Sequence, residues 1–86
     1  MKNGLIVDYI GNKRWFKDGL NHREDGPAIE WVDGGKSWYL NDLYHRIDGP
    51  AIEWSNGYKE WYIHGEYIPC KTNEEFLRLV KMKVFW

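Results

Sequence analysis

Two His-Arg pairs are the residues whose types and spacing most invite a chemical interpretation. They are His22-Arg23 and His45-Arg46, which stand 23 residues apart. Two imidazoles could share a zinc ion, whose nitrogen ligands lie at about 2.0–2.1 Å. If each pair marks one β-hairpin, however, the two lie two strands apart, roughly 9–10 Å at about 4.8 Å per strand. We therefore predict no metal site and expect both pairs to hydrogen-bond aspartates or free carbonyl groups at the turns between hairpins.

Candidates for a nucleophile or a general acid are weak. Ser37 and Ser55 lack the Gly-x-Ser-x-Gly sequence of a nucleophile elbow. Cys70 lies at a predicted junction between sheet and helix, where packing explains it better than a reactive thiol. Glu30 and Glu53 could stand within the roughly 5–9.5 Å that glycoside hydrolysis requires. Their identical place in two repeats favours a structural role beside lysines of neighbouring strands, so we predict no catalytic residue, no cofactor and no enzymatic activity.

An internal repeat of 23 residues sets the spacing of all these residues. HREDGPAIEW at 22–31 and HRIDGPAIEW at 45–54 differ at one position, and the same offset finds a third, more diverged copy towards the N-terminus. The copies align at Ile6, Ile29 and Ile52; Gly11, Gly34 and Gly57; Trp15, Trp38 and Trp61; and Phe16, Tyr39 and Tyr62. Such periodicity is typical of a repeat array, in which about three units are needed for a stable stack.

Each repeat has the pattern of a β-hairpin. Ala-Ile-Glu-Trp is a short strand of β-forming residues, and Lys-x-Trp followed by Tyr or Phe is the returning strand. Gly34 and Gly57 lie in the turn between them, so we predict a positive φ or a tight loop there. The residues to which we assign a structural role in turns and repeat junctions are His22, Asp25, Gly26, His45, Asp48, Gly49, Gly34 and Gly57.

A short helix is predicted after the repeats, over residues 72–84. Thr72 is suited to the N-cap position and Glu75 to the third helical position of a capping box. An apolar stripe follows, made of Phe76, Leu77, Val80 and Val84. We therefore predict one domain over 1–86, mainly β in the α+β sense: a single antiparallel sheet of three hairpin repeats over 4–68, with the C-terminal helix against one sheet face.

The aromatic residues are the best candidates for partner binding. We expect one column of tryptophans across the three hairpins and a second column of Phe16, Tyr39 and Tyr62 on the other face. Loop length decides the register: a two- or four-residue loop places Trp38 on the face of Ile29, and a three-residue loop places it beside Glu30. One helix covers one face, so the other column is either an exposed binding strip or core against a second subunit. The predicted partner-binding residues are Trp15, Trp38, Trp61, Tyr39, Tyr62, Arg23 and Arg46.

Composition excludes several classes of protein. Twelve Lys and Arg against thirteen Asp and Glu give a net charge of −1, without the basic excess of a nucleic-acid-binding protein. A single cysteine excludes an intramolecular disulfide and favours a reducing compartment. The first residues have neither the charge pattern of a signal peptide nor the apolar length of a membrane span. We expect a soluble, cytoplasmic protein that binds neither nucleic acid nor membrane.

The repeat resembles the MORN repeat, whose period is near 23 and whose pattern is close to Tyr-x-Asn-Gly-Lys-x-His-Gly-x-Gly. Residues 39–45 match that pattern in phase, and residues 46–50 depart from it, with Arg-Ile-Asp-Gly-Pro in place of Gly-x-Gly. The version with His-Arg-x-Asp-Gly-Pro-Ala is similar to the MORN-like variant of small bacteriophage proteins. This resemblance implies a hairpin sheet that serves as a scaffold or binding surface, in an accessory protein acting in the cytoplasm of an infected bacterium.

The function that we predict is a non-enzymatic protein-binding module that binds and inhibits a host protein. The resemblance to small phage proteins implies that this host protein belongs to a defence system. Three alternatives remain open. The first is an oligomeric sponge that sequesters a nucleotide signal, with Arg23 and Arg46 on the phosphates and an aromatic ring on the base. The second is a self-assembling structural protein, as a homodimer or higher homo-oligomer. The third is an enzyme.

Overall fold

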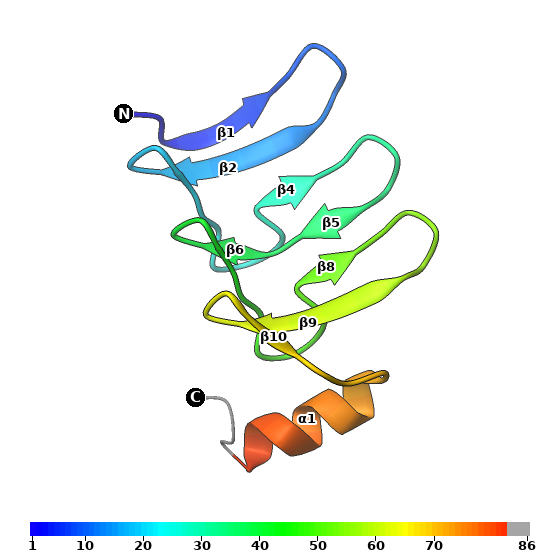
Figure 1. Ribbon diagram of the computed structural model, residues 1–86. Coiled ribbons are helices and arrows are strands. Elements are labelled where there is room, and N and C mark those ends of the chain that lie inside the picture. Colours follow the sequence, from blue (N-terminus) through cyan, green and yellow to red (C-terminus); the bar gives the residue numbers. More distant parts are fainter. Residues whose placement is uncertain (83–86) are drawn as a thin grey trace.

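The computed structural model describes residues 1–82, which form an antiparallel β-protein with one C-terminal helix, as predicted. Figure 1 shows hairpins stacked one after another, with the helix beyond the last of them. The strands are β1 (Gly4–Val7), β2 (Lys13–Lys17), β3 (Leu20–Asn21), β4 (Ile29–Glu30), β5 (Lys36–Ser37), β6 (Tyr39–Leu40), β7 (Leu43–Tyr44), β8 (Ile52–Glu53), β9 (Lys59–Ile63) and β10 (Glu66–Ile68). Within these residues the main sheet has the order β1-β2-β4-β5-β8-β9-β10, with β3 also paired to β2.

Each repeat turns through a three-residue loop that ends on glycine. In the second repeat the N–H of Trp31 donates to the carbonyl of Gly35 at 2.9 Å, and the N–H of Gly34 donates to that of Trp31 at 3.0 Å. The first and third repeats make the same two bonds. The φ angles of Gly34 and Gly57 are +98° and +91°, which confirms the prediction for both turns, since this region favours glycine.

The three-residue loop settles the register that the sequence left open. Glu30 lies opposite Lys36 and Ile29 lies opposite Ser37 across the hairpin. Trp38, the next residue along, therefore lies on the face of Glu30 and not on the face of Ile29. We call the side with the three repeat tryptophans the tryptophan face. The opposite side, which carries the isoleucines of β4 and β8 and the tyrosines, is the tyrosine face.

The second repeat departs from the predicted single sheet, because β6 and β7 form a separate two-stranded sheet. The interruption lies at Trp38, between β5 and β6. Its N–H donates to the carbonyl of Ala51 on one side at 2.7 Å, and its carbonyl accepts from the N–H of His45 on the other side at 3.1 Å. Trp15 makes the same two bonds within the continuous strand β2, so the backbones of the two repeats correspond and the interruption is one residue wide.

The helix α1 spans Asn73–Lys81 and begins where predicted. The Oγ1 of Thr72 accepts from the N–H of Glu75 at 3.1 Å, and the carboxylate of Glu75 accepts from the N–H of Lys71 at 2.9 Å. The reciprocal bond of the capping box thus shifts by one residue from the N-cap. Met82 is the C-cap of α1, and residues 83 and 84 of the predicted helix, with Val84 of the predicted stripe, lie outside the described residues.

The helix packs on the tryptophan face of the last repeat. Phe76 is fully buried, and its ring centroid lies 6.3 Å from that of Trp61. Leu79 and Val80 complete this contact, whereas Leu77 is 44% exposed. The predicted stripe was therefore wrong at Leu77, because positions three and four residues beyond Phe76 share its side of the helix.

The helix covers the end of the repeat stack rather than the length of a sheet face. In Figure 1 it lies beyond β9 and β10, at the opposite end from β1. Its buried side chains meet Trp61, Ile63 and Ile68 of the last repeat. Terminal repeats need such a cap because they have a neighbour on one side only. Within residues 1–82 there is no helix of the length and apolarity that crossing a membrane requires.

Candidate functional site

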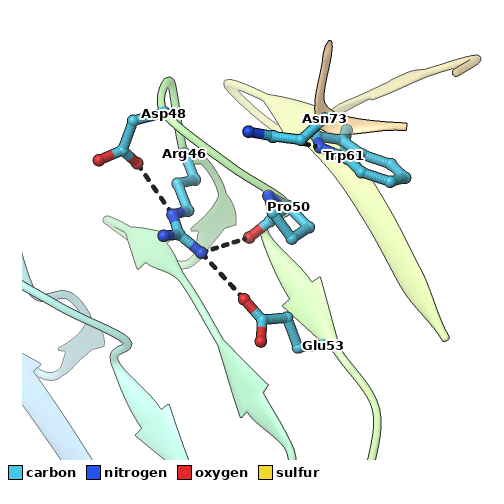
Figure 2. Close-up of polar contacts among 6 residues, drawn as sticks. All are labelled: Arg46, Asp48, Pro50, Glu53, Trp61 and Asn73. Atoms are coloured by element: carbon cyan, nitrogen blue, oxygen red, sulfur yellow. Dashed lines mark hydrogen bonds and ion pairs between the residues drawn. The ribbon is translucent and has the colours of Figure 1, made fainter. Parts of the chain in front are cut away.

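An arginine-centred cluster on the tryptophan face joins the second repeat to the third, and Figure 2 shows its polar contacts. The guanidinium carbon of Arg46 lies 3.9 Å from the ring centroid of Trp38. Its Nε donates to the carboxylate of Asp48 at 2.9 Å, and its Nη1 donates to the carbonyl of Pro50 at 3.2 Å and to the carboxylate of Glu53 at 3.1 Å. We call this arrangement an arginine brace, since it links the loop, the returning strand and the next hairpin.

The first repeat holds a second brace with nearly the same geometry. Arg23 lies 3.9 Å from the ring centroid of Trp15. It donates to Asp25 at 2.9 Å, to the carbonyl of Pro27 at 3.2 Å and to Glu30 at 3.2 Å. Two repeats thus place the same ion pairs at the same positions, which explains why the segments 22–31 and 45–54 are almost identical.

The positive charge of each arginine is neutralised by carboxylates of the same brace. The side chains of Arg23 and Arg46 are 24% and 22% exposed, and each pairs with two carboxylates. The hydrogen bond from Arg23 and its positive charge lower the pKa of the Asp25 carboxyl. Because one guanidinium faces two carboxylates, each brace carries a net negative charge at neutral pH.

The glycine of each junction leaves the room that the brace requires. A Cβ on Gly49 would lie 2.7 Å from the guanidinium carbon of Arg46, and one on Gly26 would lie 3.0 Å from that of Arg23. Any larger residue would push the guanidinium away from its partners. The glycines that the sequence assigned to the repeat junction thus lie directly against the braces.

The third repeat replaces the brace with the helix. Pro69 stands at the position equivalent to Arg46. The indole N–H of Trp61 donates to the side-chain oxygen of Asn73 at 3.1 Å, as Figure 2 shows, and Phe76 packs beside the ring. Trp61 is 3% exposed, so the helix covers the last tryptophan as a guanidinium covers each of the other two.

The three repeat tryptophans do not stack on one another as predicted. The described ring contacts of these residues are with Arg23, Arg46 and Phe76, and none of them joins two tryptophans of the column. Equivalent residues lie two strands apart, roughly 9–10 Å, which leaves room for an intervening cation. The prediction that the three tryptophans stack was therefore wrong.

The tyrosine face does carry a row of rings. Tyr39 stacks on Tyr44 with centroids 4.5 Å apart, Tyr44 lies 5.0 Å from Tyr62, and Tyr62 meets Tyr67 edge-on at 5.6 Å. Burial is the main cause that raises the pKa of both Tyr39 and Tyr62. Phe16 stands apart from the row.

The sequence-based prediction did not include two members of the row, Tyr44 and Tyr67. They occupy equivalent positions of the repeat, where the first copy has Asn21. Aligning that column of the repeat was the signal that would have found them. Phe16, which we expected in the row, instead has the ammonium of Lys2 at 5.3 Å from its ring centroid.

The two repeat histidines fasten the turn of the following hairpin. The Nδ1 of His22 accepts from the N–H of Asn41 at 3.0 Å, and the Nδ1 of His45 accepts from the N–H of His64 at 2.9 Å. The rings of His45 and His64 lie 4.3 Å apart. Burial, with a smaller effect of His64, lowers the pKa of His45. Within residues 1–82 no three His, Cys, Asp or Glu side chains gather as metal ligands.

Of the polar residues considered for catalysis, Ser55 is exposed, and Ser37, Cys70, Glu30 and Glu53 are engaged in packing or pairing. The hydroxyl of Ser37 accepts from the indole N–H of Trp31 at 3.2 Å. Cys70 packs beside the helix, where burial, and to a lesser degree Glu75, raises the pKa of its thiol to about 11. A thiol with that pKa stays protonated at neutral pH and is a poor nucleophile. Glu30 and Glu53 lie opposite Lys36 and Lys59 across their hairpins, as expected, and their described ion pairs are with the arginines.

An open groove of about 600 Å³ lies between the two braced loops. Its apolar lining comes from Trp38, Leu40 and Ile47, and Ile47 is 49% exposed. Its remaining lining residues are Arg23, Glu24, Asp25, Gly26, His45, Arg46 and Asp48. Since the arginines are paired internally, the groove combines an apolar floor with carboxylates on both margins.

No protein family, curated protein or solved structure that we compared with this chain matches it. The resemblance to MORN repeats therefore stays a prediction from the repeat pattern.

Proposed function

We propose that the chain is a non-enzymatic protein-binding module that contacts its partner through the groove between the two braced loops. The observation that carries this proposal is the lining of the groove, where Trp38, Leu40 and Ile47 meet water between acidic margins. Apolar and aromatic side chains at the centre of a polar rim are typical of protein interfaces. The braces fix the loops on either side, so the surface is formed before the partner binds.

The charges of the groove favour a polypeptide over a nucleotide. A nucleotide sponge needs arginines that are free to hold phosphates. Arg23 and Arg46 each already donate to two carboxylates. Asp25 and Asp48 of the lining are among these paired carboxylates, and Glu24 adds a further negative charge. A partner segment with apolar and basic side chains complements this surface, and phosphate groups do not.

A protein of a bacterial host is the partner that the resemblance to small phage proteins favours, and inhibition of a host defence protein is the proposed outcome. Binding would then act by occupying a surface of that protein, since blocking requires no chemistry from this chain. The assignment of the host rests on fold-level analogy, whereas the assignment of the groove rests on its residues.

Affinity capture from host lysate, followed by mass spectrometry of proteins and small molecules, tests the proposal. Ile47→Glu is the informative variant, because Glu24 already occupies the equivalent position of the first loop and the exchange therefore suits the fold. Val32→Glu, at a 64% exposed residue of a hairpin loop, is the matched control. We expect the parent and the control to retain one protein in stoichiometric yield and Ile47→Glu to lose it.

Two results would contradict the groove as the binding surface. One is equal capture by Ile47→Glu and the parent, and the other is equal loss in both variants. Release of a nucleotide from the denatured parent, without a captured protein, would support the sponge instead.

Self-association is a second candidate, favoured by the outer edge of β1. Leu5 of β1 lies opposite Trp15 of β2, and the N–H of Trp15 donates to the carbonyl of Ala28, away from β1. The two residues therefore form a non-hydrogen-bonded pair, in which the N–H and carbonyl of Leu5 point outwards from the sheet edge. Leu5 and Val7 are 49% and 52% exposed. An apolar edge strand of this kind tends to pair with another chain. Light scattering should give a dimer mass for the parent and a monomer mass for Val7→Lys; a monomeric parent at high concentration excludes this candidate.

A further inference from the structure

The contact between Arg14 and Trp31 on the tyrosine face shows how this fold holds a guanidinium group. Arg14 belongs to β2 and lies opposite Ile29 of β4. Its guanidinium carbon lies 5.0 Å from the ring centroid of Trp31, at the start of the next hairpin loop. A cation within about 6 Å of a tryptophan centroid is attracted by the negative charge of the ring face.

The next pair of repeats keeps the tryptophan but lacks the arginine. The equivalent residues, 23 positions further along the chain, are Ser37 for Arg14, Ile52 for Ile29 and Trp54 for Trp31. Ser37 lies opposite Ile52, as Arg14 lies opposite Ile29, so the backbones correspond. The serine side chain is too short to reach the ring of Trp54.

A pocket of about 220 Å³ lies at this position. Its volume corresponds to about seven water molecules at roughly 30 Å³ each, which is ample for a guanidinium and part of its alkyl stem. The lining residues are Trp31, Asp33, Gly35, Ser37, Tyr44, Ile52, Glu53, Trp54 and Ser55. The pocket thus takes the place that an arginine side chain fills one repeat earlier.

The lining has the character of a cation site. Trp31 and Trp54 come from neighbouring hairpin loops, and Tyr44 adds a third ring. The hydroxyl of Ser37 accepts from the indole N–H of Trp31, which fixes the orientation of that wall. Asp33 contributes a carboxylate that accepts from the N–H of Gly35. Aromatic faces together with a carboxylate favour a cation and disfavour an anion.

We propose that this pocket binds the guanidinium group of an arginine side chain from a partner polypeptide. Arginine is the cation that this chain itself places on tryptophan, at Arg14, Arg23 and Arg46. Its planar group stacks on an aromatic ring while its N–H groups donate to a carboxylate, which an ammonium does less well. The pocket lies on the tyrosine face and the groove on the tryptophan face, so the two sites succeed or fail independently.

Titration of the full chain with a blocked Gly-Arg-Gly tripeptide, followed through the indole N–H resonances by NMR, tests the assignment. The control is the same peptide with citrulline, which has the shape of arginine without its charge. We expect saturable shifts of the Trp54 and Trp31 resonances with the arginine peptide and at least tenfold weaker binding of the citrulline peptide. Equal binding of both peptides overturns the proposal. Free arginine that binds as tightly as the peptide overturns the assignment to a polypeptide.

Ser37→Arg provides the matched variant, since it gives the second pair of repeats the arginine that the first pair has. We expect a folded protein in which the new guanidinium fills the pocket and peptide binding falls at least tenfold, whereas Ser37→Gln weakens it less. Trp54→Leu, at a 52% exposed residue, removes one wall and should also weaken binding at least fivefold. Parental affinity in folded Trp54→Leu contradicts the proposal even if Ser37→Arg does not fold.

Discussion

The guanidinium of Arg46 lies 3.9 Å from the ring centroid of Trp38, and the same group donates to Glu53 at 3.1 Å. These three residues come from a repeat junction, a returning strand and the next hairpin. Removing the cation leaves Glu53, whose side chain is 33% exposed, without its ionic partner. We predict that Arg46→Gln lowers the free energy of unfolding by about 1.5–3 kcal/mol.

Urea denaturation measures this effect, and Lys17→Gln, at the exposed end of β2, is the control, with an expected change within about 0.5 kcal/mol. A double variant, Arg46→Gln with Glu53→Gln, should recover part of the loss, because the carboxylate left without a partner is removed. Equal stability of Arg46→Gln and the parent would show that the brace contributes nothing.

Gly57 tests the backbone conformation of the three-residue loops. Its φ is +91°, and a Cβ there would meet no atom within 4 Å, so any effect of substitution comes from backbone strain rather than from a clash. We predict that Gly57→Val lowers the free energy of unfolding by about 1–3 kcal/mol. Gly57→Asn should lower it less, because asparagine tolerates positive φ. Thermal melting of both variants tests this prediction. A valine variant with the same melting temperature as the parent would contradict the loop geometry.

Phe76 tests the role of the helix as a cap on the repeat stack. It is fully buried against Trp61, whereas its neighbour Leu77 is 44% exposed. We predict a loss of about 3–5 kcal/mol for Phe76→Ala and at most about 1 kcal/mol for Leu77→Ala. Chemical denaturation of the two variants compares them directly. Similar losses would mean that the helix packs through a different side.

The stability of the fold should depend on the protonation of His45. Burial and His64 lower its pKa in the folded state, so the unfolded chain binds a proton at a higher pH than the folded chain does. The contribution of neutral His45 is therefore fully present above about pH 6.5, the usual histidine pKa, and is lost as the pH falls towards the lowered folded pKa. Protonation also removes the lone pair that accepts from the N–H of His64.

We predict that the parent loses stability between about pH 7.5 and 5.5 and that His45→Gln loses less over the same range. Urea denaturation at both pH values gives the two differences. A steeper loss in the variant than in the parent would reverse the assigned sign.

The repeat made the fold largely predictable from the sequence. A constant offset of 23 identified the hairpins, and Gly34 and Gly57 marked their turns because few other residues adopt that backbone conformation. Thr72 marked the start of the helix through its own local hydrogen bond. These features depend on residues close in sequence, and so they can be recognised without knowing the tertiary structure.

The side-chain contacts between repeats could not be predicted in the same way. Whether Trp38 meets another tryptophan or a guanidinium depends on the register, which one loop residue reverses. Arg46 lies over the ring of Trp38, and this contact depends on the path of the junction loop rather than on a local sequence pattern. Tyr44 entered the tyrosine row for the same reason, through its pairing opposite Tyr39.

Site-specific photo-crosslinking tests the central claim, that the groove between the braced loops is the partner-binding surface. Benzoylphenylalanine in place of Ile47 puts the reactive group in the groove, and the same residue in place of the fully exposed Tyr9 puts it on a hairpin loop of the first repeat. We predict that irradiation in host lysate yields one dominant crosslinked protein from position 47 and none from position 9. A crosslink from position 9 alone, or the same product from both positions, would contradict the claim.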